Sequence, residues 1–338
     1  MMSRRTFLKS TLAILLSSCV TKKPVSGIEE RIITKFPKAK DSKVYVIKTE
    51  DREYGVKKLL ENFDLENVED AKVAIKANYN SADPFPATTH LRTLSAIVDK
   101  LKELKAHVIL AERSGMGETR RVLEKMGVIS LAAKKEFDVV VLDELQAEEW
   151  VRDKFEGMHW KRGYLFPRVF KDNVVVQTCC LKTHRFGGHF TLSLKNSVGM
   201  VAKFDPLDGY NYMSELHSSK NMRKMIAEIN VSYQPEFVVL DAIKGFSTGG
   251  PERGTIIEPK LMLASKDRIA IDAVGVSILR IHGTTKDVSQ GRVFEQEQIA
   301  RAVELGLGAE KPEDVELIPL NREAEDVCEK IEEELRRM

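Results

Sequence analysis

Apolar residues recur along the chain in two alternating patterns. Short continuous runs of valine, isoleucine and leucine predict buried strands at 43–48, 71–78, 106–112, 137–144, 173–179, 235–243, 260–265 and 315–320. Stretches with apolar residues three or four positions apart predict helices at 54–63, 88–104, 117–127, 267–283, 292–305 and 323–337. Continuously apolar strands that are separated by helices are typical of the α/β class. We therefore expect a mostly parallel sheet with helices on both faces.

The composition bounds the domain organisation and the partners. The chain has 338 residues, of which 43% are hydrophobic and 31% charged, a profile typical of a globular protein. No long Pro/Gly/Ser-rich linker divides it, so residues 41–338 are expected to form a single α/β domain, or two intimate lobes. The formal net charge is only +2, which argues against nucleic acid as a partner.

Residues 1–19 have the pattern of a bacterial export signal. Arg4 and Arg5 lie in a stretch that resembles a twin-arginine signal, and the following apolar run is far shorter than the about 20 residues that a spanning helix needs. Leu16-Ser17-Ser18-Cys19 resembles a lipobox, which predicts lipidation at Cys19. We expect export by the twin-arginine route and anchoring at the outer face of the cell membrane or in the periplasm, with residues 20–40 as a tether.

The cysteines argue against an iron–sulfur cluster. Besides Cys19, only Cys179, Cys180 and Cys328 are present, and no Cys-x-x-Cys occurs. We therefore expect no iron–sulfur cluster within this chain.

Polar residues follow the predicted strand at 71–78. In open α/β sheets, ligands bind beyond the carboxyl ends of the strands. Lys76, Asn78 and Asn80 would share one face if the strand continued, because side chains alternate along a strand. A lysine with neighbouring amides suits a phosphate or a carboxylate, so we expect Lys76 and Asn78 to bind an anionic ligand.

A second polar cluster lies in residues 180–200. Lys182, His184, His189, Lys195 and Asn196 together could bind an anion, bind a metal or relay protons. We expect the two lysines to neutralise the ligand, Asn196 to orient it, and Lys182 and His184 to belong to a catalytic group. His184 is the expected proton carrier, because the ordinary pKa of imidazole is about 6.5. The alternative is a divalent metal held by His184 and His189, although two imidazoles are fewer than a metal site normally has.

Two further features are candidate parts of the site. Gly249 and Gly250 lie in a glycine-rich stretch after a predicted strand, where backbone N–H groups could bind an oxyanion. Asp272 lies among apolar residues of a predicted helix, so its carboxylate should face a cation or a polar cleft and is a candidate catalytic group. By contrast, Asp267 and His90 are expected to cap helices.

Several of these stretches resemble one family. VAIKANYNS, LKTHRFGGHFTLSLKNSVGM, DAIKGFSTGGPERGT and ASKDRIAIDAVG are similar to the motifs of the domain of unknown function 362 family, and the resemblance covers roughly residues 43–310. Many relatives carry an attached ferredoxin-like segment with cysteine ligands for iron–sulfur clusters, which this sequence does not show. The resemblance supports the fold and the location of the site but implies no particular reaction.

Two functions of different classes fit these patterns. The first is an exported, lipid-anchored enzyme that acts on a small anionic or metal-bound ligand. The second is a ligand-binding lipoprotein, or an accessory subunit that serves a membrane transporter or a redox complex as its partner. A ligand recovered unchanged from the purified protein would favour the second.

The export signal can be tested directly. Replacing Arg4 and Arg5 together by lysine should leave the precursor in the cytoplasm, because the twin-arginine pair is the feature that the route reads. Cys19→Ala should abolish lipid labelling. Cell fractionation and labelling with a lipid precursor would measure both effects, and normal behaviour of both variants would contradict this interpretation.

Overall fold

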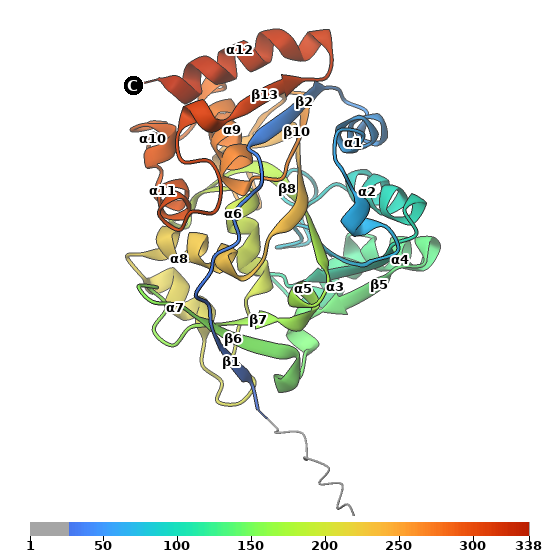
Figure 1. Ribbon diagram of the computed structural model, residues 1–338, viewed down its shortest axis with the longest axis vertical. Helices are drawn as coiled ribbons and strands as arrows, with labels where there is room; N and C mark the ends of the chain where they lie inside the picture. Colours follow the sequence, from blue (N-terminus) through green and yellow to red (C-terminus); the bar gives the residue numbers. More distant parts are fainter. Residues whose placement is uncertain (1–26, 338) are drawn as a thin grey trace, which may run out of the picture.

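A large mixed sheet forms the centre of the computed structural model, which describes residues 27–337 (Figure 1). Within that range the sheet has ten strands. Eight of them follow the order β13 (Glu316–Pro319), β2 (Lys43–Lys48), β12 (Leu261–Ser265), β10 (Pro235–Gly249), β8 (Val174–His184), β3 (Lys72–Lys76), β4 (His107–Glu112) and β5 (Asp138–Val141). The other two, β9 (His189–Thr191) and β11 (Gly254–Ile257), pair with β8 and β10. The strands from β10 to β5 are parallel, which confirms the predicted α/β class.

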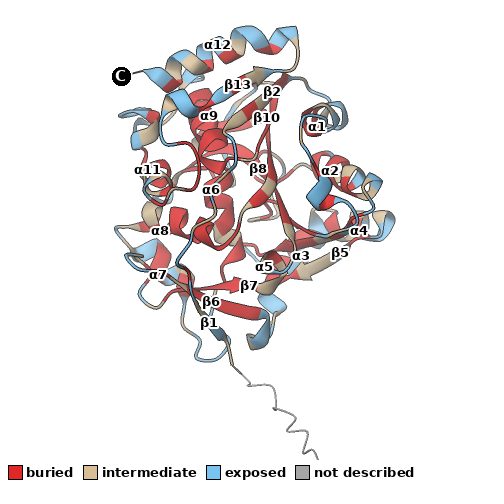
Figure 2. Cartoon of the chain, in the orientation of Figure 1, coloured by how far each residue is buried: buried red, intermediate tan, exposed pale blue. Residues whose placement is uncertain are grey.

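Alternating side chains of the sheet pack into different hydrophobic cores on its two faces. Along β10, Val238 and Leu240 contribute to one core, and Phe237 and Val239 contribute to the other. The first core is completed by α9 (Arg268–Ile281), α11 (Glu297–Glu304) and α12 (Arg322–Arg336). The second is completed by α1 (Arg52–Leu60), α2 (Leu91–Glu103), α3 (Thr119–Lys125) and α4 (Val128–Lys135). Helices thus cover both faces and bury the strands between them (Figure 2).

A second, smaller sheet lies beside the first. Over the described part of the chain it has three strands in the order β1 (Glu29–Ile32), β6 (Trp150–Lys154) and β7 (Tyr164–Pro167). Arg31 on β1 forms an ion pair with the buried Asp153 on β6, at 2.9 Å. Residues 29–32, which fall within the predicted tether over 20–40, form β1 and pair with β6. The predicted export signal and Cys19 lie outside the described residues.

The helices and strands predicted from the apolar pattern are present, with two differences that affect the site. Strands β8 and β10 run further than the pattern indicated, to His184 and Gly249. The glycine-rich stretch after residue 244 is consequently a β-hairpin formed with β11, not a loop.

Strand β12 is antiparallel to both of its neighbours. The apolar pattern predicts no element at 150–167 or 212–229, where the structure has β6, β7, α7 (Tyr212–Ser218) and α8 (Met222–Ile229).

Both predicted helix caps are confirmed. The Nδ1 atom of His90 accepts a hydrogen bond from the backbone N–H of Arg92 at 3.1 Å. The carboxylate of Asp267 accepts bonds from the N–H groups of Ile269 and Ala270, and also binds Ser42 and the N–H of Ala309. Asp267 therefore links the start of α9 to two other segments. Over residues 27–337, no helix combines the length and apolar character needed to cross a bilayer.

The buried N-cap residue Asp267 should contribute more to the free energy of unfolding than an exposed N-cap residue. Asp267→Ala removes the acceptor of several buried donors and should lower the free energy of unfolding by about 1–3 kcal/mol. The matched control is Asp51→Ala, because Asp51 caps α1 from an exposed position and accepts bonds from Glu53 and Tyr54. Its loss should cost about 1 kcal/mol. Urea unfolding measures both, and equal costs would contradict the bridging role of Asp267.

Candidate functional site

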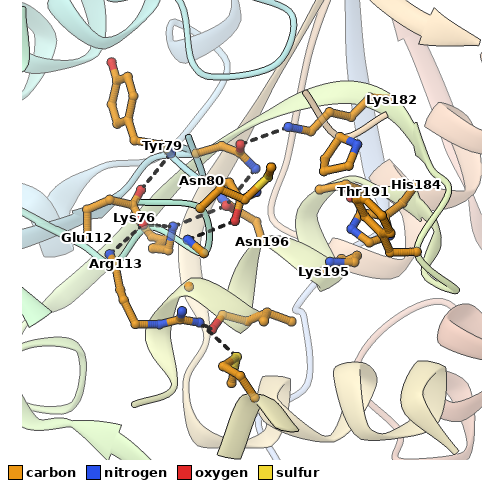
Figure 3. Close-up of a pocket in the computed structure, with 18 of the residues that line it drawn as sticks. Lys76, Tyr79, Asn80, Glu112, Arg113, Lys182, His184, Thr191, Lys195 and Asn196 are labelled. Atoms are coloured by element: carbon orange, nitrogen blue, oxygen red, sulfur yellow. Dashed lines mark hydrogen bonds and ion pairs between the residues drawn. The ribbon is translucent and has the colours of Figure 1, made fainter. Parts of the chain in front are cut away.

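A cavity of about 620 Å³ lies beyond the carboxyl ends of β3, β4 and β8 (Figure 3). This is the edge at which α/β sheets bind ligands. The cavity is lined by Lys76, Asn78, Tyr79, Asn80, Glu112, Arg113, Gly115, Met116, Lys182, His184, Phe186, Thr191, Lys195, Asn196, Val198, Gly199, Met213, His217 and Pro251. Side chains from widely separated parts of the sequence therefore converge on one space.

A buried ion pair closes the β3–β4 side of the cavity. Nζ of Lys76 lies 2.6 Å from Oε1 of Glu112, and each residue is only 1% exposed. The carboxylate also accepts the backbone N–H groups of Arg113 and Tyr79, at 2.9 and 3.2 Å. Burial lowers the pKa of Lys76 and raises that of Glu112, and the mutual attraction opposes both shifts. Gly199 makes room for this pair, because a Cβ there would lie 2.9 Å from the lysine Nζ.

Two asparagines connect this pair to Lys182. Oδ1 of Asn196 accepts from Nζ of Lys76 at 3.3 Å and from Nδ2 of Asn78 at 3.2 Å. The Oδ1 atom of Asn78 accepts from Nζ of Lys182 at 3.1 Å, and that ammonium also donates to the carbonyl of Ala87. The network fixes both amides and both lysines. Asn78 and Asn196 are thus engaged with protein groups and position the lysines.

Lys195 differs from the other lysines of the cavity. It is 9% exposed, and its ammonium has no hydrogen bond or ion pair with any described residue. Burial, with Lys182 and Arg113 nearby, lowers the pKa of Lys195 from its ordinary 10.5 to about 7. Its amine therefore titrates near neutral pH and lines the cavity without a partner among residues 27–337.

Four lining residues each have a buried polar atom without a partner among the described residues. The atoms are Oη of Tyr79, Nε of Arg113, Nδ1 of His184 and Oγ1 of Thr191. Burial and the charges of Lys195 and Lys182 lower the pKa of His184 far below its ordinary value, so the ring is neutral near pH 7. The expected choice of His184 as proton carrier rested on its ordinary pKa and loses that support, whereas Lys195 titrates in the required range.

His184 and Lys195 approach each other at Gly188. A Cβ at that glycine would lie 2.6 Å from Cε of Lys195 and 2.9 Å from Nδ1 of His184. Residue 188 must therefore be small for the two side chains to keep their positions. This gives the Gly187-Gly188 pair a specific packing role beside the cavity.

The charges of the cavity do not balance. Lys76, Arg113, Lys182 and Lys195 face it, and Glu112 is the one carboxylate among its described lining residues. The guanidinium of Arg113 donates to the carbonyls of Ser114 and Val198, and its Nε has no partner in the described part of the chain. The lining thus carries an excess of positive charge.

Of the residues predicted from sequence, six line this cavity: Lys76, Asn78, Lys182, His184, Lys195 and Asn196. Asp272 does not. Its carboxylate accepts the N–H groups of Ser193 and Leu194 at 2.7 and 3.0 Å, at the start of α6 (Ser193–Asn196). Burial raises its pKa to about 8. Asp272 therefore contacts no cavity group and holds in place the short helix that carries Lys195 and Asn196.

Gly249 and Gly250 also lie outside the lining, in the turn of the β10–β11 hairpin. A Cβ at Gly250 would lie 1.8 Å from the carbonyl oxygen of Thr183, so the glycine is needed for close packing of the hairpin on β8. The carbonyl of Gly250 accepts from the N–H of Arg185 at 3.3 Å. The expected oxyanion-binding role of the two glycines does not follow from this geometry.

The two candidate metal ligands are opposite each other in the β8–β9 hairpin. His184 lines the cavity, whereas His189 does not and lies beside Gln296. Among residues 27–337, no group of three or more His, Cys, Asp or Glu side chains is suited to hold a metal ion. The structure thus adds no third ligand to the histidine pair.

Several lining residues were not predicted from the sequence. Glu112 and Arg113 end a predicted strand, so the reasoning that identified Lys76 would also have identified them. Met213 and His217 lie on α7, in a segment without an assignment. No sequence pattern pointed to that helix as part of the site.

Comparison with known proteins gives one match. No curated protein matches the chain. The family model described as domain of unknown function (DUF362) matches residues 73–277, which is more than half of the 338 residues. This span begins in β3, ends in α9 and includes every residue that lines the cavity. The chain therefore belongs to the DUF362 family.

Proposed function

We propose that this protein is an exported, lipid-anchored enzyme that binds a small anionic ligand in the strand-end cavity and acts on it through Lys195. The observation that carries the proposal is the buried amine of Lys195, which faces the cavity without a partner in the described chain. A buried cation without a counterion is costly, so such a group is expected to meet its counterion in a ligand.

The charge excess supports an anion in particular. Lys182 and Arg113 are the charged groups that, with burial, depress the pKa of Lys195. Two like unit charges about 4 Å apart repel by roughly 4 kcal/mol at an effective dielectric near 20. An anion among these groups replaces repulsion by attraction. A carboxylate or a similar small oxyanion would supply the negative charge that this group of cations lacks.

The titration of Lys195 favours an enzyme over a simple binding protein. A group that exchanges protons near neutral pH suits proton transfer, whereas pure capture is served by a permanently charged lysine. A ligand-binding lipoprotein that serves a transporter or a redox complex is the alternative. Native mass spectrometry and metal analysis of protein purified after export would distinguish them, since an unchanged bound ligand favours the binder.

The anion site predicts a ligand-dependent gain in stability. Sulfate or oxalate should raise the melting temperature of the wild-type protein, and saturation at 100 times the dissociation constant corresponds to about 2.7 kcal/mol. Lys195→Met should remove most of this shift, because it keeps the bulk of the side chain and removes its charge. Lys57→Met is the control, since Lys57 is exposed on α1 and should respond as the wild type does.

An equal response of the Lys195→Met and Lys57→Met variants to both anions would contradict the proposed site. Circular dichroism of each variant without ligand verifies that the fold is retained. This keeps a loss of anion binding separate from a loss of structure.

Anion affinity should fall as the pH rises. Only the protonated amine attracts an anion, and the pKa of Lys195 in the free protein is about 7. From pH 6 to pH 8 the protonated fraction decreases roughly tenfold, so the dissociation constant for sulfate should increase about tenfold. Sulfate keeps its charge over this range. Isothermal calorimetry at both pH values measures the change, and a constant affinity would show that Lys195 does not hold the anion.

A further inference from the structure

We propose that Nζ of Lys195 forms an imine with the carbonyl carbon of a small carboxylate-bearing ligand, of which a 2-oxo acid is the simplest class. This inference rests on the proposed function, because it assigns chemistry to the same anion site. It adds a covalent step and a ligand class that anion binding alone does not require.

The first argument is the contrast among the three cavity lysines. The ammonium of Lys76 is held by Glu112 and by Asn196, and that of Lys182 by Asn78 and Ala87. Burial lowers the pKa of both of these amines, but hydrogen bonds hold them in place. Lys195 has no such acceptor among the described residues, so its amine can reach a ligand without breaking a bond to them. It is therefore the cavity lysine that is free to form a new bond.

The second argument is the environment of that amine. A lysine becomes a nucleophile when desolvation and a neighbouring cation favour its neutral form. Lys195 meets both conditions, because it is 9% exposed and lies near Lys182 and Arg113. A substantial fraction of the amine is therefore neutral at pH 7.

The third argument concerns how the ligand would be placed. A 2-oxo acid carries its carboxylate on the atom next to the carbonyl carbon. Cations that bind the carboxylate therefore also fix the position of the adjacent carbonyl carbon. Lys182 and Arg113 line the same cavity as Lys195 and are the charged groups available to do this.

The reaction balances without a further reactant. Nζ of neutral Lys195 attacks the carbonyl carbon, and the C=O π electrons move to oxygen. Both N–H protons of the amine end on that oxygen, which leaves as water when the C=N bond forms. Nδ1 of His184 and Oγ1 of Thr191 are buried polar atoms without partners among the described residues, and both residues line the cavity. A neutral imidazole and a hydroxyl can each donate or accept a hydrogen bond while the protons move, without becoming charged.

Reductive trapping tests the proposal. The mature protein is incubated with pyruvate and cyanoborohydride, which converts an imine into a stable secondary amine. We expect one adduct per chain, located at Lys195 by peptide mapping. Trapping should fall at least tenfold in Lys195→Arg, which keeps the positive charge but cannot form the imine, and should be unchanged in Lys57→Met.

Sulfate binding separates the two proposals. If sulfate stabilises the protein but pyruvate leaves no adduct at Lys195, the imine is refuted and the anion site stands. An adduct spread over exposed lysines such as Lys57 would also refute it. If neither sulfate nor oxalate stabilises the wild type, the proposed function fails. Mapping the adduct in the wild-type protein requires no variant, so misfolding of Lys195→Arg would not obscure the result.

Discussion

The need to compensate buried charge determines the arrangement of the strand ends. Lys76 and Glu112 are the last residues of the adjacent parallel strands β3 and β4. Both are buried, and Nζ of Lys76 lies 2.6 Å from Oε1 of Glu112. Removing one partner of such a pair commonly costs 3–5 kcal/mol, because the other charge is then buried alone. Asn196 accepts a further hydrogen bond from Lys76 and one from Asn78, and Asn78 in turn accepts one from Lys182. The β3, β4 and β8 ends are thereby locked in one geometry.

Against this fixed background, the freedom of Lys195 is informative. The short helix α6 carries both Asn196 and Lys195. The side chain of Asn196 is held by several hydrogen bonds, whereas the amine of Lys195 makes none with the described residues. Asp272 binds the first N–H groups of that helix, so the backbone beneath both residues is held in place. The backbone that carries Lys195 is therefore fixed, while its amine forms no hydrogen bond with the described residues. Such a combination of rigid backbone and free functional group is what a reactive site requires.

Much of this site followed from one rule applied to the sequence, namely that polar residues after buried strands gather at one edge. That rule placed Lys76 and Asn78 at the cavity because β3 and its neighbours β4 and β8 are parallel. It could not show which lysine would find hydrogen-bond acceptors, since those of Lys182 come from residues about a hundred positions away. Nor could it place Asp272, whose apolar surroundings indicated a partner but not that the partner would be backbone N–H groups.

The contact of Gly250 with β8 has a consequence for how this cavity can vary. The carbonyl that would collide with a Cβ at residue 250 belongs to Thr183, which stands between Lys182 and His184 in the strand. Any larger residue at position 250 would push on the backbone that carries both side chains. A change in an outer turn would therefore be transmitted to the interior as a change in cavity shape. The shape of the cavity therefore depends on a glycine that does not itself line it.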